Sequence, residues 1–313
     1  MMKINEFEQL IAPMGKRGLN VLLGTDQNRK TIYTDLAKTG HIAIDQNPTV
    51  REAMMHTMIC SLICRIRENP CSIVIISPDN DKFSVYEQRP EVSIASNMDE
   101  AMGWLGSCSA MFDARRDHCE NRGYSNIYEA NDPFVQPIVV FIDDANYLLD
   151  HGRCAEGYFV QLERSGAQYG IHLIFGIDFA KSNVRKTNIE KLAPAKILHR
   201  NGIELVKNGV AIPLHLTSIY LDNEVKEKAA LAAADSDSAS LNRQNEILRK
   251  EAKENTIAVK WTRSEEPKPT VQRQNVQSKA RKPRRMGLFR TIYALWNTKP
   301  IMFVSSEYPI RIK

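Results

Sequence analysis

Short apolar runs alternate with segments of helical periodicity between about residue 20 and residue 230. The runs are rich in isoleucine and valine and lie at 41–44, 72–76, 138–142 and 171–175. Uninterrupted apolar runs of this length are typical of strands that helices cover on both faces of a parallel sheet. The pattern therefore predicts a doubly wound α/β fold with a mostly parallel sheet and helices on both faces.

The segment 52–67 has the pattern of a helix that packs on a sheet. Its apolar residues recur every three or four positions and form one wide stripe: Met54, Met55, Met58, Ile59, Leu62, Ile63 and Ile66. The bend at 45–52 joins the strand at 41–44 to this helix and reads Asp-Gln-Asn-Pro-Thr-Val-Arg-Glu. The bend contains no glycine.

The composition changes after residue 222. The segments 224–234 and 241–254 are charged and rich in alanine, and they predict exposed or fraying helices. The segment 263–285 is rich in Pro, Gln, Lys and Arg and is predicted to be disordered. We therefore divide the chain into a helical N-terminal lead (1–19), the α/β domain (20–230), a charged linker (231–285) and an amphipathic C-terminal segment (286–313).

Charge is distributed unevenly along the chain. The formal net charge is +5, but residues 262–313 contain twelve Lys and Arg against three Glu, which leaves a mildly acidic body. Such a basic tail favours a polyanionic partner. The cluster Lys279, Arg281, Lys282, Arg284 and Arg285 is its densest part.

The cysteines and the apolar segments argue against two other classes of protein. None of the six cysteines stands in a CxxC pair, so buried thiols are expected rather than disulfides or a metal site. No run of about 18 uncharged apolar residues is present, and the first residues lack the pattern of a signal peptide. The sequence therefore predicts a cytoplasmic protein without its own membrane span.

Several short motifs occur in an order that resembles the motor domain of the FtsK/SpoIIIE family of DNA translocases. Together they extend over about two thirds of the chain. They are Leu23-Gly-Thr-Asp26, Asp35-Leu-Ala-Lys38 with His41, Ile76-Ser-Pro-Asp79, Ser84-Val-Tyr-Glu87, Trp104, Arg115-Arg116, Gly123-Tyr-Ser-Asn126, the strand 138–142 with Asp143-Asp144, Gly170-Ile-His-Leu173, and the segment from Pro213-Leu-His-Leu216 to Asp222-Asn-Glu-Val225. The resemblance implies a RecA-like P-loop NTPase fold. It also implies structural roles for His41 and His172.

The resemblance places the phosphate-binding loop of the family at the bend 45–52. Thr49, Arg51 and Glu52 then take the cofactor-binding positions, with Arg51 in place of the usual Lys and Glu52 in place of the usual Ser or Thr. Glycines in such a loop let several backbone N–H groups converge on the phosphates, and this loop has none. Pro48 removes one more N–H, while Asp45 and Glu52 add negative charge beside a triphosphate.

Other positions of the implied active site are altered as well. Asp143 and Asp144 stand where the family has Asp-Glu, the metal-binding and water-orienting carboxylates, although they could instead cap the end of a buried strand. Asp178 replaces the sensor glutamine. Arg164 lies in the segment that supplies the inter-subunit arginine, and a plain surface arginine is the alternative. The family's motif IDSRTILDQxGAExLLGxGDM has no counterpart in this chain between His199 and Val210.

These changes predict a degenerate FtsK/SpoIIIE-like protein that associates with double-stranded DNA and lacks efficient ATP hydrolysis. By resemblance, it would form a homo-oligomer, or a mixed ring with an intact FtsK-like ATPase, in plasmid transfer, phage packaging or secretion. No cofactor is then expected. The alternatives are an active translocase that uses ATP and Mg²⁺ through a divergent loop, and a non-enzymatic adaptor in a secretion or conjugation complex.

The basic tail leaves three alternatives open. The cluster at 279–285 could neutralise DNA phosphates. Joined to the amphipathic segment that follows it, the cluster could instead contact an anionic membrane surface and recruit the protein there. The third alternative is a solvated linker that ends in a peptide for docking to a partner.

Overall fold

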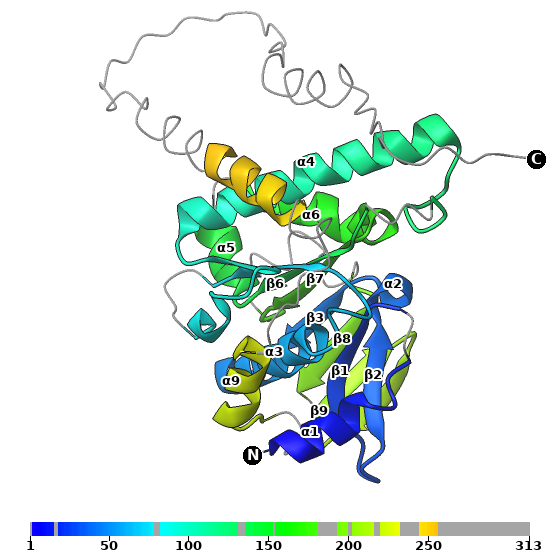
Figure 1. Ribbon diagram of the computed structural model, residues 1–313, viewed down its shortest axis with the longest axis vertical. Helices are drawn as coiled ribbons and strands as arrows, with labels where there is room; N and C mark the ends of the chain where they lie inside the picture. The colour runs from blue at the N-terminus through cyan, green and yellow to red at the C-terminus, as the bar shows by residue number, and fades with distance from the viewer. Residues whose placement is uncertain are drawn as a thin grey trace, which may run out of the picture. The chain divides into compact units, whose positions relative to one another are not determined.

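An eight-stranded, mostly parallel sheet forms the centre of the computed structural model (Figure 1). The strand order is β10-β9-β8-β3-β7-β6-β4-β5. The six strands from β8 to β5 run parallel, while β9 and β10 are added as antiparallel strands. The strands are β3 (Ile42–Asp45), β4 (Ser72–Ile76), β5 (Val92–Ala95), β6 (Ile138–Ile142), β7 (Ile171–Gly176), β8 (Ala195–His199), β9 (Ile203–Lys207) and β10 (Val210–Leu214).

The structure describes residues 2–15, 18–77, 82–130, 135–152, 154–180, 193–199, 202–215, 220–231 and 244–255. These lie within a unit that spans Met1–Glu266. The predictions for the basic cluster at 279–285 and for the amphipathic segment at 286–313 fall outside the described residues. The predicted domain boundaries stay predictions.

Two apolar layers cover the faces of the sheet (Figure 1). On one face lie α1 (Ile4–Ile11), α3 (Pro48–Ile63), α9 (Asn223–Leu231) and a separate antiparallel pair, β1 (Asn20–Thr25) and β2 (Thr31–Asp35), which leads into the short helix α2 (Leu36–Thr39). On the other lie α4 (Met98–Arg122), α5 (Ala145–His151) and α6 (Ala155–Ser165). Two short 3-10 helices lie at Ser84–Tyr86 and Gly166–Tyr169.

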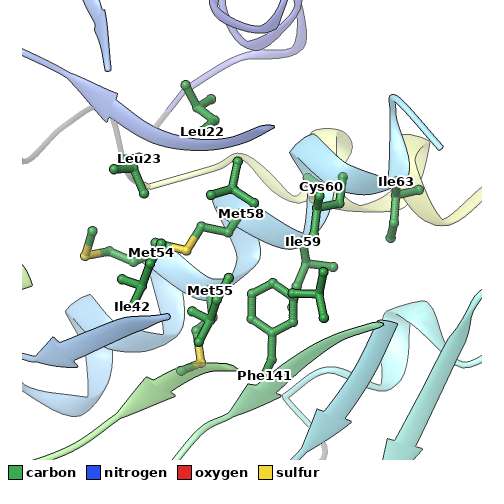
Figure 2. Close-up of a cluster of buried hydrophobic side chains, with 14 of the residues drawn as sticks. Leu22, Leu23, Ile42, Met54, Met55, Met58, Ile59, Cys60, Ile63 and Phe141 are labelled. Carbon is green, nitrogen blue, oxygen red and sulfur yellow. The ribbon is translucent and has the colours of Figure 1, made fainter. Parts of the chain in front are cut away.

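The helix α3 lies between β1 and the sheet, so apolar residues surround it. Figure 2 shows Leu22 and Leu23 of β1 on one side of the helix and Phe141 of β6 on the other. Twelve of the sixteen residues of α3 are buried. The wide apolar stripe read from the sequence is explained by this double burial, because both sides of the helix exclude water.

The predicted α/β fold with four buried central strands is confirmed, whereas the predicted start of the first long helix was wrong. That helix begins at Pro48, four residues before Glu52, because the Asn47 side chain accepts a hydrogen bond from the Val50 backbone N–H and caps it. Asn followed by Pro at the first helical position is a known start signal. The outer strands were missed because several of their positions are exposed or half-buried, so no uninterrupted apolar run marks them.

The helix at 244–255 covers the edge strand β5 and is not the exposed helix that the sequence suggested (orange in Figure 1). Leu248 and Ala252 are buried in the apolar layer beneath it. The Arg249 guanidinium donates to the backbone carbonyls of Pro90 and Val92. An open strand edge exposes unpaired backbone groups, and this arginine satisfies two of them. The sequence thus predicted the helix correctly and its exposure wrongly, because the charged composition does not show that a few apolar residues are buried.

Arg115 connects this helix to the rest of the domain. Its guanidinium is buried and donates to the carbonyls of Tyr169, Gly170 and Gln136 and to the side chain of Gln244. Burial lowers the pKa of this guanidinium to about 10. Its four acceptors come from three separate parts of the chain, which explains an arginine at a buried position.

Membrane spans and metal sites can be considered for the described residues. Within them, no helix is long and apolar enough to cross a membrane, and no group of His, Cys, Asp or Glu could hold a metal ion. All six cysteines are unpaired thiols. The histidines expected to be structural are buried and hydrogen-bonded: His41 accepts from the Leu173 backbone N–H, and His172 contacts the Gly40 carbonyl and the Tyr128 hydroxyl.

Candidate functional site

The candidate site lies where three neighbouring parallel strands end. In the sheet, β7 lies between β3 and β6. The helix α3 follows β3 after two residues, Asp143 follows β6 directly, and Gly176 ends β7. Ligands of open α/β sheets bind at this carboxyl edge, so the fold brings the predicted phosphate-loop and carboxylate positions together there.

The N-terminus of α3 already uses its backbone donors. Pro48 has no N–H, the Val50 N–H donates to the Asn47 side chain at 3.0 Å, and the Arg51 N–H donates to the Asn47 carbonyl at 3.0 Å. The Thr49 side chain is exposed at the first turn. The Arg51 bond is the ordinary first bond of the helix, so the four donors of the helix start are those of residues 47–50. An anion-binding helix start directs several N–H groups at one point, and two of these four are absent (Pro48) or engaged (Val50).

Arg51 connects α3 to the carboxylates that follow β6. Its Nε lies 3.5 Å from Asp143 Oδ1, and its Nη2 lies 3.8 Å from Asp144 Oδ2. The side chains of Arg51 and Asp143 are 8% and 7% exposed, so this ion pair is buried, whereas Asp144 is 38% exposed. A buried charge is costly without an opposite charge, and each partner supplies that charge to the other.

Lys82 is a second cation in the same cluster, and no motif in the sequence singled it out. Its Nζ lies 3.3 Å from Asp143 Oδ2 and 3.6 Å from Glu52 Oε2. The Ser77 hydroxyl donates to the same Asp143 oxygen at 3.4 Å. Lys82 belongs to the connection after β4, so only the sheet order brings it near α3. Among the described residues, the cluster thus contains two cations and three carboxylates.

Asp144 and Asp178 also have structural partners. Asp144 caps α5 by accepting from the Tyr147 N–H at 3.0 Å. Asp178 accepts from the Ala180 N–H through its side chain, and its backbone exchanges two hydrogen bonds with the side chain of Asn146. Asp144 therefore caps the helix that follows β6, which differs from the strand-end capping considered for the Asp143-Asp144 pair.

Arg164 is an exposed residue in the last turn of α6. Its role as the inter-subunit arginine stays a prediction. The residue before it, Glu163, is buried, and burial raises the pKa of its carboxyl to about 8. Both carboxyl oxygens of Glu163 lack a hydrogen-bond partner in the part of the chain that the structure describes.

A chain of polar contacts continues from the cluster into the interior. Glu52 lies 4.0 Å from His56, one turn along α3. The His56 ring lies tilted against the Phe83 ring. It is hydrogen-bonded at 2.8 Å to the Tyr86 hydroxyl, and this hydroxyl also contacts the Cys60 thiol. Burial, together with the nearby cations Lys226 and Lys82, lowers the pKa of His56 to about 3. His56 is therefore neutral at physiological pH.

Comparison with known proteins shows what this chain is similar to. No family model matches the chain. The DNA translocase FtsK of Campylobacter jejuni is 25% identical over 199 residues, which are 60% of this chain and 21% of that protein. FtsK of Haemophilus influenzae is 24% identical over 227 residues, 62% of this chain and 42% of that protein. The chain is a divergent relative of the FtsK DNA translocases.

Solved structures support the fold of this FtsK relative. The conjugation coupling protein TcpA of pCW3, determined with ATPγS, matches 60% of this chain and 56% of its own, with a TM-score of 0.52 and 20% identity. The cytoplasmic domain of the type VII secretion ATPase EccC of Thermomonospora curvata matches 72% of this chain and 32% of its own, with a TM-score of 0.56 and 14% identity. The RecA-like fold is thus confirmed. The chain spans about a fifth of the length of the first curated relatives that it matches.

Proposed function

We propose that this protein is a degenerate FtsK-like subunit that associates with double-stranded DNA and does not hydrolyse ATP efficiently. It would act as a ring or accessory subunit in DNA translocation or transfer, as a homo-oligomer or beside an intact FtsK-like ATPase. The observation that carries this proposal is the pairing of Asp143 with Arg51 and Lys82. The carboxylate expected to organise Mg²⁺ is neutralised by cations of its own chain.

The remaining residues of the site fit Mg·ATP poorly. Glu52 stands where a hydroxyl would bind Mg²⁺, and it is paired with Lys82 instead. Arg51 stands where a lysine would reach the phosphates, and it lies against Asp143 and Asp144. With two cations against three carboxylates, the cluster does not attract a ligand whose charge is about −4. The engaged N–H groups at the start of α3 remove the usual compensation.

One observation favours the alternative of an active translocase with a divergent loop. At this edge of the sheet, four buried polar atoms have no hydrogen-bond partner among the described residues: both amide atoms of Gln46, Arg51 Nε and Asp143 Oδ1. Buried polar groups are usually satisfied, so such a group can mark the place of a ligand or an ordered water molecule. A ligand that displaced Lys82 and Arg51 from Asp143 would make the carboxylates available.

Titration of the purified protein with Mg·ATP separates these two functions. We expect no binding at about millimolar nucleotide, a concentration that corresponds to a free energy of about −4 kcal/mol, and no phosphate release above background, with or without duplex DNA. The measurement is isothermal calorimetry combined with a phosphate-release assay. Micromolar binding that Arg51→Ala abolishes would instead establish the active translocase.

DNA is proposed as the partner because the curated relatives are named DNA translocases and because the tail is basic. We expect that replacing Lys279, Arg281, Lys282, Arg284 and Arg285 with alanine weakens duplex binding. It should also lower the slope of log affinity against log salt by about one for each phosphate that the tail no longer neutralises. Fluorescence anisotropy at several salt concentrations measures both quantities.

Two results would redirect this part of the proposal. Unchanged duplex binding by the five-alanine variant would place the DNA contact on the body instead of the tail. If neither protein binds duplex, the non-enzymatic adaptor is favoured, with the segment 286–313 as its docking peptide or as a peripheral membrane contact. Flotation with anionic vesicles distinguishes the last two.

A further inference from the structure

Arg51 reaches the carboxylates by crossing the end of the strand that separates them. Arg51 lies on the helix after β3 and Asp143 lies at the end of β6, while β7 runs between these strands and ends at Gly176. A Cβ atom added to Gly176 would lie 1.9 Å from Arg51 Cδ and 2.5 Å from Arg51 Nε. The arginine therefore occupies the space that any side chain at position 176 would need.

We propose that Gly176 is the positioning residue of this site: its lack of a side chain lets Arg51 lie across β7 and hold Asp143 and Asp144 in an ion-paired state without nucleotide. The inference rests on the proposed function and specifies how the paired state is kept. Gly176 does not have a positive φ, so the backbone conformation does not require glycine there. Space is the requirement that the structure shows.

The position of Arg51 also explains why α3 is tied to the end of β6. Arg51 belongs to α3, Asp143 directly follows β6, and Asp144 caps α5. The Arg51 guanidinium therefore connects three elements of the fold. Lys82 adds a fourth connection, from the segment after β4 to Asp143 and Glu52. A larger residue at position 176 would interrupt the ion pairs of Arg51 and leave those of Lys82 in place.

Manganese binding tests this proposal directly. In Gly176→Ala, the displaced guanidinium should free Asp144 Oδ2 and Asp143 Oδ1, while Lys82 stays on Asp143 Oδ2. Mn²⁺ affinity should then rise by about tenfold or more over wild type, a difference of about 1.4 kcal/mol. Electron paramagnetic resonance of free Mn²⁺ measures the affinity. Gly157→Ala is the matched control, because a methyl group there would meet no atom within 4 Å among the described residues. An unchanged Mn²⁺ affinity in folded Gly176→Ala overturns the proposal.

A double-mutant cycle separates the role of the arginine from that of the backbone. A Cβ at position 176 would also lie 2.3 Å from the Asp143 carbonyl, a conflict that remains when Arg51 is removed. We expect Gly176→Ala to lower the unfolding temperature less in an Arg51→Ala background than in wild type. Equal decreases in both backgrounds would assign the conflict to the Asp143 carbonyl and refute the proposal.

The same cycle stays informative if Gly176→Ala does not fold. Folding of the double variant Arg51→Ala/Gly176→Ala would then support the proposal. Failure of both Gly176→Ala variants, when Arg51→Ala alone folds, would refute it. Neither outcome depends on nucleotide. Wild-type protein that binds Mg·ATP would refute the proposed function but would leave the coupling between Arg51 and Gly176 unchanged, so the two failures can be told apart.

Discussion

Arg51→Met is expected to destabilise the fold by about 2 kcal/mol, because the buried Asp143 loses one of its two cations. The cost is below the roughly 3 to 5 kcal/mol of a buried charge left without any partner, since Lys82 remains 3.3 Å from Asp143. The side chains of Arg51 and Asp143 are both less than a tenth exposed, so water cannot take the place of the guanidinium. Methionine keeps much of the volume of the arginine stem and isolates the effect of the charge. Urea unfolding at pH 7, followed by circular dichroism, measures the change.

Two further variants show whether charge is the cause. Lys38→Met removes an exposed ion pair with Asp35, in which the lysine side chain is 84% exposed, and should change stability by less than about 0.5 kcal/mol. Arg51→Met/Asp143→Asn removes charge on both sides and should recover part of the stability. If the double variant is as unstable as the sum of both single variants, the two charges do not stabilise each other.

The stability of the protein should be greatest near pH 6.5, because buried histidines and glutamates oppose each other. Burial lowers the pKa of His41 and His56 to about 3 and that of His172 to about 4. Burial raises the pKa of Glu163 to about 8 and that of Glu251 to about 7. The ordinary values, which apply to the unfolded chain, are 6.5 for His and 4.5 for Glu.

On each side of this maximum, the change of stability with pH depends on whether the folded or the unfolded state binds more protons. Between pH 6.5 and 4.5 the unfolded chain binds protons at three histidines while the fold binds them at two glutamates, so stability falls by roughly 1 kcal/mol per pH unit as the pH decreases. Below pH 4.5 the glutamates are protonated in both states, and the histidines alone make the fall steeper. Between pH 7 and 8 the fold loses stability as the pH rises, because it keeps a proton on the buried Glu163 that the unfolded chain has already released.

Glu163→Gln tests this account with a single change. The amide cannot ionise, so the variant should lose the alkaline limb, be more stable than wild type at pH 8.5, and show a steeper loss of stability below pH 6.5. Unfolding temperatures measured from pH 4 to pH 9 give both limbs. A variant whose profile runs parallel to that of wild type above pH 7 would show that Glu163 is ionised in the fold.

The central strands and the family resemblance were accessible from the sequence because they depend on local patterns. Isoleucine-rich runs identify buried strands without knowledge of their neighbours. The start of α3 is also encoded locally, by Asn47 followed by Pro48. Because the family resemblance assigns this segment to a vestigial phosphate loop, the cap was not predicted. The helix at 244–255 was predicted, but its burial was not, because its few apolar residues are buried only by the packing of the helix on the rest of the domain.

The sequence alone thus determined a parallel α/β framework and the replacement of the residues that usually bind phosphate and magnesium. Tertiary structure alone decided what the replacements do: Lys82 meets Asp143 and Glu52, and Arg51 crosses β7 over Gly176. The physical reason is that these contacts follow from strand order. Periodicity along a chain reports which residues are buried, whereas the order of strands in a sheet decides which buried charges face each other.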